Sequence, residues 1–119
     1  METPTTEFVP VPDIGAFEGL LQESQQHPVV LFLHDPSCPI SRAAHRQMTR
    51  LGGPVPLVDV RTGTQISRAI EERTGVQHES PQVILLDHGQ AAWSASHYAI
   101  TAQAVEVALR DTRKVSGAS

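Results

Sequence analysis

The sequence predicts an α/β domain with a four-stranded mixed sheet, a parallel βαβ unit followed by an antiparallel hairpin, flanked by helices. The first observation behind this prediction is a continuous apolar run over residues 29–33, which is typical of a central strand buried on both faces. The second is that this run and a later one, residues 55–60, are each followed by a segment with helical spacing. The third is a pair of strand-like segments joined by His88-Gly89, which indicates a hairpin.

The first third of the chain is predicted to contain an extended segment, a helix and a strand. Residues 1–12 carry prolines and threonines without helical spacing, so we expect an extended N-terminal arm. Asp13 is a favourable N-cap for a helix that reaches to about residue 26. The strand over residues 29–33 follows this helix. The helix carries its apolar stripe on Ile14, Phe17, Leu20 and Leu21.

The middle of the chain alternates helix and strand. A helix has Pro39 at its first position, where the missing N–H would have no partner, and it ends at Gly52-Gly53. The strand over residues 55–60 contains Pro56, and because a proline cannot donate to a sheet ladder we expect this strand at an edge of the sheet. A third helix spans residues 64–74. The apolar face of the helix after Pro39 consists of Ile40, Ala43, Ala44, Met48 and Leu51.

The last third of the chain is predicted to form the hairpin and a final helix. The two strands of the hairpin span residues 82–87 and 90–96. Thr101 caps the final helix, and Ile100 and Val105 have the spacing of a hydrophobic staple at its start.

The composition indicates one globular domain. We place it at residues 13–112, between the arm and a tail of residues 113–119 that we expect to fray. The chain has 119 residues, of which 39% are hydrophobic and 18% charged, and its net charge of −4 gives no sign of nucleic-acid binding. No apolar run reaches the length of about 20 residues that a membrane span needs, and the N-terminus lacks the basic start and apolar stretch of a signal peptide. We therefore expect a cytoplasmic protein with neither nucleic acid nor membrane as a partner.

The histidines and the cysteine give no indication of a metal site. A single cysteine excludes an intramolecular disulfide and a Cys-rich zinc cluster. The six histidines form neither a His-Glu-x-x-His motif nor a tight pair on one predicted face, so we expect them on the surface or lining a site.

Cys38 is the most informative residue, because it is the predicted N-cap of the helix that begins at Pro39. At an N-cap the free backbone N–H groups and the positive end of the helix dipole favour the thiolate, which is the nucleophilic form. Ser41 lies one turn along the same face, where its hydroxyl is able to hydrogen-bond the sulfur or to help cap the helix. Since Ser41 cannot form a disulfide, a mixed disulfide on Cys38 has to wait for a thiol from another molecule. The alternative is a buried structural cysteine, which free cysteines usually are.

The order of the predicted elements resembles the thioredoxin fold, in which the redox cysteine begins the helix after the central strand. Thioredoxin-like proteins carry a cis-proline beside the reactive sulfur, just before the third strand, and Ser80-Pro81 matches that place. The resemblance therefore implies a cis Ser80–Pro81 peptide bond.

Three stretches of the chain carry a narrower resemblance. They are Phe32-Leu33-His34-Asp35-Pro36-Ser37-Cys38-Pro39-Ile40-Ser41, then His78-Glu79-Ser80-Pro81-Gln82, then Trp93-Ser94-Ala95-Ser96-His97 leading into Ile100-Thr101. Together they resemble the YtxJ-like monothiol bacilliredoxin family, bacterial thioredoxin-fold proteins tied to the low-molecular-weight thiol bacillithiol.

This resemblance implies a monothiol thiol-disulfide oxidoreductase with Cys38 as its redox-active residue. Cys38 would attack a protein–bacillithiol mixed disulfide, free the client thiol and hold bacillithiol until a second bacillithiol removes it. Bacillithiol is then a co-substrate, and no tightly bound cofactor is expected. The implied partners are this low-molecular-weight thiol and S-thiolated client proteins, and we expect a monomer or weak homodimer.

The same end of the predicted fold offers contacts for a thiol ligand. Backbone groups at Ser80, before Pro81, are placed to pair with an extended ligand as a strand would. Ser96, His97 and the start of the last helix are placed to receive an anionic part of the ligand, although His97 serves equally well as a structural hydrogen-bonding residue. The catalytic candidates are Cys38 and Ser41, and the substrate-binding candidates are Pro39, Ser80, Pro81, Ser96 and His97.

Two departures from related sites leave other functions open. The Trp-Cys-Gly-Pro-Cys of thioredoxin is absent, which argues against a general dithiol reductase. In place of the lysine that bacilliredoxin-like sites carry before the cysteine stand His34 and Asp35, and a nearby carboxylate opposes thiolate formation. The second hypothesis is a thioredoxin-like binding module without exchange activity, either an adaptor or a carrier of a thiol-ligated iron–sulfur cluster. A peroxide-reducing enzyme is disfavoured, because no companion arginine-and-threonine arrangement surrounds Cys38.

Overall fold

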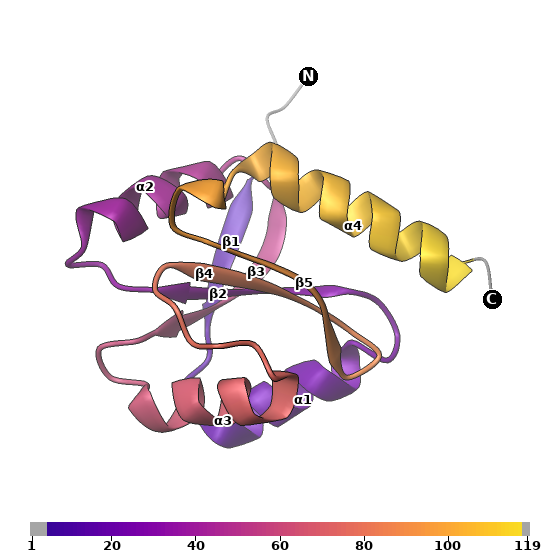
Figure 1. Ribbon diagram of the computed structural model, residues 1–119, viewed down its shortest axis with the longest axis horizontal. Helices are drawn as coiled ribbons and strands as arrows, with labels where there is room; N and C mark the ends of the chain where they lie inside the picture. The colour runs from indigo at the N-terminus through magenta and orange to yellow at the C-terminus, as the bar shows by residue number, and fades with distance from the viewer. Residues whose placement is uncertain (1–4, 118–119) are drawn as a thin grey trace.

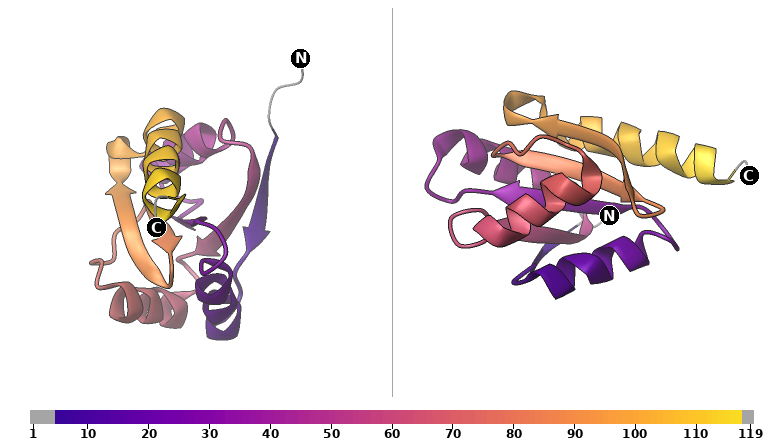
Figure 2. Two further views of the ribbon diagram at one scale, coloured as in Figure 1. Left: turned by 90° about the vertical axis from the view of Figure 1, so that its right-hand side faces the viewer. Right: turned by 60° about the horizontal axis from the view of Figure 1, so that its bottom comes forward.

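The computed structural model describes residues 5–117, and the side chains of residues 5–114. A five-stranded mixed sheet in the order β1-β3-β2-β4-β5 lies between two layers of helices. Figures 1 and 2 show α1 and α3 on one face of the sheet and α2 and α4 on the other. In chain order the elements are β1 (Thr6–Pro10), α1 (Ile14–Glu23), β2 (Val29–His34), α2 (Pro39–Met48), β3 (Gly53–Asp59), α3 (Thr64–Thr74), β4 (Gln82–Asp87), β5 (Gln90–Ser96), the short 3-10 helix η1 (His97–Ala99) and α4 (Ala102–Gly117).

Strand β2 is the centre of the sheet, and all six of its residues are buried. It pairs in parallel with β3 and antiparallel with β4, and β4 continues into β5 through the turn at His88-Gly89. His88 and Gly89 have positive φ angles of 52° and 76°, as a tight hairpin turn requires. The predicted βαβ unit and hairpin are therefore confirmed.

The fifth strand, β1, was not predicted. Part of the expected N-terminal arm pairs in parallel with β3, with Phe8 opposite Val55. The hydroxyl of Thr6 donates to the carbonyl of Met48 (2.8 Å) and accepts from the N–H of Gly52 (2.8 Å), which fastens the strand to the end of α2. The paired residues are 47 positions apart in the chain, as Thr6 and Gly53 are, and no local pattern reveals such a pairing. The sequence therefore predicted four strands where the sheet has five.

The expectation that β3 lies at an edge of the sheet is wrong, because β3 runs between β1 and β2. The Gly53 N–H donates to the Thr5 carbonyl, and the Leu57 carbonyl accepts from the Val11 N–H. The backbone N–H and C=O groups of odd-numbered β3 residues therefore point towards β1. The backbone nitrogens of Pro54 and Pro56 therefore point towards β2, but β2 pairs with β3 only from Leu57 onward. The prolines occupy the stretch of β3 where no ladder bond to β2 needs their missing N–H.

Each face of the sheet has its own apolar core. Leu31 and Leu33 of β2 pack with α1 and α3, whereas Val30 and Phe32 pack with α2 and α4. This alternation explains why the strand reads as a continuous apolar run. Among the described residues, no helix is long and apolar enough to cross a membrane.

Helix α4 extends further than expected. It runs to Gly117, whereas a frayed tail was predicted from Arg113 onward. The segment contains no helix breaker before Gly117, and Lys114 lies in the last turns, where a cation is favourable beside the negative end of the helix dipole. The last two residues of the expected tail lie outside the described part of the chain.

Candidate active site

Cys38 is the N-cap of α2, as predicted, with Pro39 as the first helical residue. Its backbone is extended (φ −99°, ψ 125°), and its carbonyl accepts the first helical hydrogen bond from the Arg42 N–H (2.9 Å). The side chain is half-buried and makes no capping hydrogen bond. The sulfur therefore lies beside a helix start whose own side-chain cap is missing, a place that favours a negative charge.

The turn between β2 and α2 is organised by Asp35. Its carbonyl accepts from the Cys38 N–H (3.0 Å), and its carboxylate oxygen Oδ1 accepts from the Ser37 hydroxyl (2.6 Å) and the Ser37 N–H (2.9 Å). These bonds, the one from the hydroxyl first, lower the pKa of the Asp35 carboxyl below its ordinary value. Asp35 is thus a carboxylate at neutral pH, turned towards Ser37.

Ser41 is fully buried and joins the end of β2 to α2. Its Oγ accepts from the Asp35 N–H (2.8 Å) and lies 2.7 Å from Nδ1 of His34. The expected alternatives for Ser41 were a bond to the sulfur or a capping role. The hydrogen bonds found for its hydroxyl run to His34 and Asp35, on the strand side of the turn.

His34 and His45 form a stacked cluster behind the turn, which sequence reasoning missed. The ring of His34 lies 5.2 Å from Phe32 and 4.9 Å from His45, and His45 stacks on Phe8 at 4.3 Å. Burial lowers the pKa of His34, and His45 adds to this effect, against an opposing influence of Asp59 and Asp35. Burial also lowers the pKa of His45. Both rings are therefore neutral at pH 7.

The start of β4 and the end of β5 form the second side of the site. The Ser80–Pro81 peptide bond is cis. Leu33 of β2 pairs with Gln82 of β4, so Pro81 follows on beside the end of β2, and the Pro81 carbonyl accepts from the His97 N–H (3.1 Å). Figure 1 shows the start of α2, the start of β4, the end of β5 and η1 at one end of the sheet. The fold thus brings Pro39, Ser80, Pro81, Ser96 and His97 to the end of the sheet where Cys38 lies.

The polar groups of this second side are partly engaged within the protein. Exposed His97 has a positive φ of 54°, and its Nε2 lies 4.0 Å from a carboxylate oxygen of Glu79. The Ser80 hydroxyl oxygen is buried without a hydrogen-bond partner among the described residues. At the start of α4, the Ala102 N–H donates to Gln47 (3.1 Å) and the Ala104 N–H to Thr101 (3.1 Å). Two N–H groups of the predicted anion-binding helix start therefore already have acceptors.

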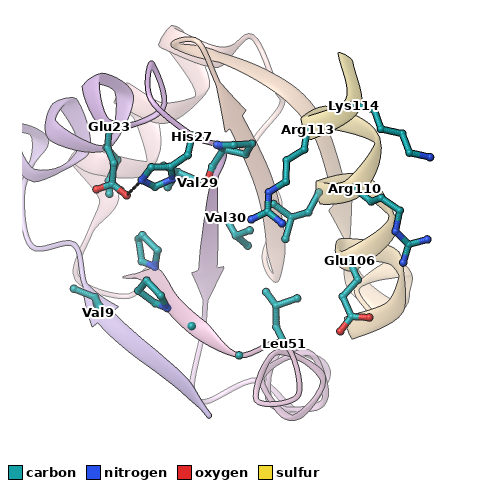
Figure 3. A pocket seen from close by; sticks show the side chains of 17 residues that line it. Val9, Glu23, His27, Val29, Val30, Leu51, Glu106, Arg110, Arg113 and Lys114 are labelled. Atoms are coloured by element: carbon teal, nitrogen blue, oxygen red, sulfur yellow. Dashed lines mark hydrogen bonds and ion pairs between the residues drawn. The ribbon is translucent and has the colours of Figure 1, made fainter. Parts of the chain in front are cut away.

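A groove of about 900 Å³ lies at the other end of the sheet, away from Cys38. It is lined by the starts of β2 and β3 and by the last turns of α4, and Figure 3 shows Arg113 pointing over it. No group of three or more His, Cys, Asp or Glu side chains in residues 5–114 is arranged to hold a metal ion.

Comparisons with known proteins agree with this arrangement. A sequence model of the family described as monothiol bacilliredoxin BrxC matches residues 10–105. Among solved structures, the chain is similar to a thioredoxin-fold protein described as a candidate oxidoreductase (TM-score 0.78, 25% identity, 85% of this chain and 92% of that chain covered). It is also similar to thioredoxin from Trypanosoma brucei brucei (TM-score 0.73, 16% identity, 96% and 97% covered) and to thioredoxin f from spinach chloroplast (TM-score 0.68, 15% identity, 95% and 99% covered). The expected thioredoxin-like fold is confirmed.

Proposed function

The chain belongs to the monothiol bacilliredoxin BrxC family and is a thiol oxidoreductase, and from this premise we propose that it removes bacillithiol, or a similar low-molecular-weight thiol, from client proteins through Cys38. The observation that carries the proposal is the lone, half-buried cysteine at the start of α2, with buried Ser41 where a second cysteine would resolve the mixed disulfide. The clients and the low-molecular-weight thiol are taken to be cytoplasmic.

The proposed reaction has two exchange steps. In the first, the Cys38 thiolate attacks the bacillithiol sulfur of the mixed disulfide, the bond between bacillithiol and the client sulfur breaks, and the client leaves as a thiolate that takes up a proton. In the second, the thiolate of another bacillithiol attacks the bacillithiol sulfur held on Cys38. Cys38 leaves as the thiolate, and the product is bacillithiol disulfide. The two exchanges conserve one disulfide bond, because the bond between client and bacillithiol is replaced by the bond of bacillithiol disulfide. The client sulfur is reduced to a thiol, and the sulfur of the second, incoming bacillithiol is oxidised to the disulfide level.

The neighbours of Cys38 support the steps in different ways. Pro39 starts the helix and leaves the next backbone N–H groups of the first turn near the sulfur. We assign Ser80, Pro81, Ser96 and His97 to the surface that receives the ligand, with the backbone at Ser80 pairing along an extended thiol. Ser41 acts on the rate by holding the turn.

The test uses a client protein or peptide carrying bacillithiol on one cysteine. Reduced protein is added, and release of the client thiol is measured with and without free bacillithiol. We expect release with the wild-type chain, none with Cys38→Ala, and a changed rate with Ser41→Ala. Intact mass after the first step should show bacillithiol on the wild-type chain and not on Cys38→Ala. Client release by Cys38→Ala at the wild-type rate would refute the proposal.

A further inference from the structure

We propose that His34 is a positioning residue for Cys38, acting through the Ser41 hydroxyl and the Asp35 peptide. The effect on the rate of exchange at Cys38 rests on the proposed function. The hydrogen bonds that connect His34 to Cys38 are present in the protein without any ligand.

The Ser41 hydroxyl connects two groups at the end of β2. A hydroxyl has one proton to donate and two lone pairs that accept. The Asp35 N–H is a donor only, so Ser41 Oγ accepts from it. We assign the hydroxyl proton to the bond with His34 Nδ1, which lies 2.7 Å from Oγ. This assignment places the proton of neutral His34 on Nε2 and satisfies all three groups. Because Ser41 has no exposed surface, water cannot replace either partner easily.

Asp35 links the Ser41 hydroxyl to Cys38. Ser41 fixes the N–H of Asp35, and the carbonyl of Asp35 accepts from the Cys38 N–H at 3.0 Å. The Asp35 carboxylate closes the same turn through Ser37. Loss of the acceptor on His34 frees the Ser41 hydroxyl to rotate, and it removes the restraint that sets where the sulfur sits relative to the first N–H groups of α2.

His34 is held in the accepting form by the groups that face it. Four charged or titratable groups act on His34. Asp35 is its neighbour in the chain, His45 lies on α2, Asp59 lies on β3, and Arg61 lies just beyond β3. Asp59 is engaged by Arg61 through a two-pronged ion pair (Nε–Oδ1 3.2 Å, Nη2–Oδ2 3.0 Å), which limits its pull on His34. With burial and His45 added, the pKa of His34 falls below its ordinary value. When acid does protonate His34, Nδ1 becomes a donor and the hydroxyl proton of Ser41 loses its acceptor.

The experiment measures alkylation of Cys38 by iodoacetamide, which requires no bacillithiol and so remains informative if the proposed function fails. Three single variants are compared with the wild type from about pH 5 to about pH 8: His34→Leu, Ser41→Ala and His34→Asn, whose Oδ1 stands where Nδ1 does. The double variant His34→Leu/Ser41→Ala completes a double-mutant cycle, which measures whether the two residues act together on the alkylation rate. Urea unfolding establishes that each variant is folded.

We expect His34→Leu and Ser41→Ala each to slow alkylation at neutral pH by about fivefold, the size of a lost interaction at a helix start. The double variant should be no slower than either single variant. His34→Asn should react within about twofold of the wild type at neutral pH. On the acid side of the His34 titration, the wild type should lose rate beyond the decline common to all the variants, and His34→Asn should show only the common decline. A folded His34→Leu that reacts at the wild-type rate, or single effects that multiply in the double variant, would overturn the inference.

Discussion

Cys38 and Asp35 are joined by a hydrogen bond from the Cys38 N–H to the Asp35 carbonyl (3.0 Å), which closes the turn between β2 and α2. The same Asp35 brings a negative charge to the neighbourhood of the sulfur. Its backbone therefore closes the turn, while its carboxylate adds a negative charge to the same turn, and a negative charge close to a thiol disfavours the thiolate in general.

Asp35→Asn should make Cys38 more reactive. The amide oxygen keeps an acceptor for the Ser37 N–H and hydroxyl, whereas the charge is removed. Because the carboxylate is exposed, we expect a modest increase in the alkylation rate at neutral pH, by up to about fivefold. Ser37→Ala is the matched control, since it retains the charge and should give no increase. A slower reaction of Asp35→Asn would show that the carboxylate supports the turn more than it disfavours the thiolate.

The stability of the protein should decline as the pH falls below neutrality. The pKa values of His34 and His45 are lowered in the folded chain, so the unfolded chain binds protons first. Their contribution to stability is present above the unfolded pKa of about 6.5 and is lost as the pH falls through the lowered folded values. Urea unfolding between about pH 7.5 and pH 5 should show this decline, and it should be flatter in His34→Leu/His45→Phe. An equal slope in the double variant would assign the decline to other groups, and exposed His27→Gln serves as the control.

Thr6→Val should weaken the attachment of β1. The change keeps the shape of the side chain but removes the hydroxyl that joins the Met48 carbonyl and the Gly52 N–H. We expect a loss of about 1–2 kcal/mol in the free energy of unfolding and faster amide exchange at Val9, whose N–H faces β3 as that of Val11 does. Thr5→Val changes an exposed neighbour in the same way and should have little effect. Equal stabilities of the two variants would mean that the hydroxyl does not hold the strand.

Gly75→Ala and Gly19→Ala should have opposite effects on stability. Gly75 caps α3 with a φ of +73°, and Gly19 lies inside α1; an added Cβ meets no atom within 4 Å at either position. Alanine at position 75 should therefore cost about 1 kcal/mol through its backbone alone. Alanine at position 19 should add about 0.5–1 kcal/mol through helix propensity. Thermal unfolding of the two variants checks the signs, and destabilisation by both would contradict this explanation.

Local patterns predicted most of the fold. The bounds of α3, β4 and β5 agree with the predictions because helical spacing and the His88-Gly89 turn are properties of neighbouring residues. The order of the strands in the sheet was harder to predict from the sequence. β1 carries no alternating apolar pattern, and once it was missed the prolines of β3 indicated an edge strand.

The site likewise has one part that neighbouring residues predict and another that depends on packing between distant segments. The N-cap position of Cys38 follows from Pro39, one residue away. The link between His34 and Ser41 depends on how α2 packs over the end of β2, which the sequence does not express. A usable signal was present: His34 directly continues a buried apolar run, and a histidine buried in this way needs a polar partner such as Ser41, seven residues later in the first turn of α2.

Pro54 and Pro56 also restrict how the sheet can assemble. If β3 slid along β2 so that Pro56 entered the paired stretch, a ring nitrogen without hydrogen would take the place of a donor such as the Val58 N–H. Slippage in that direction thus costs a ladder bond, and the two strands have a built-in stop. The parallel pairing of β2 with β3, the strands on either side of α2, is thereby protected against slippage towards the prolines.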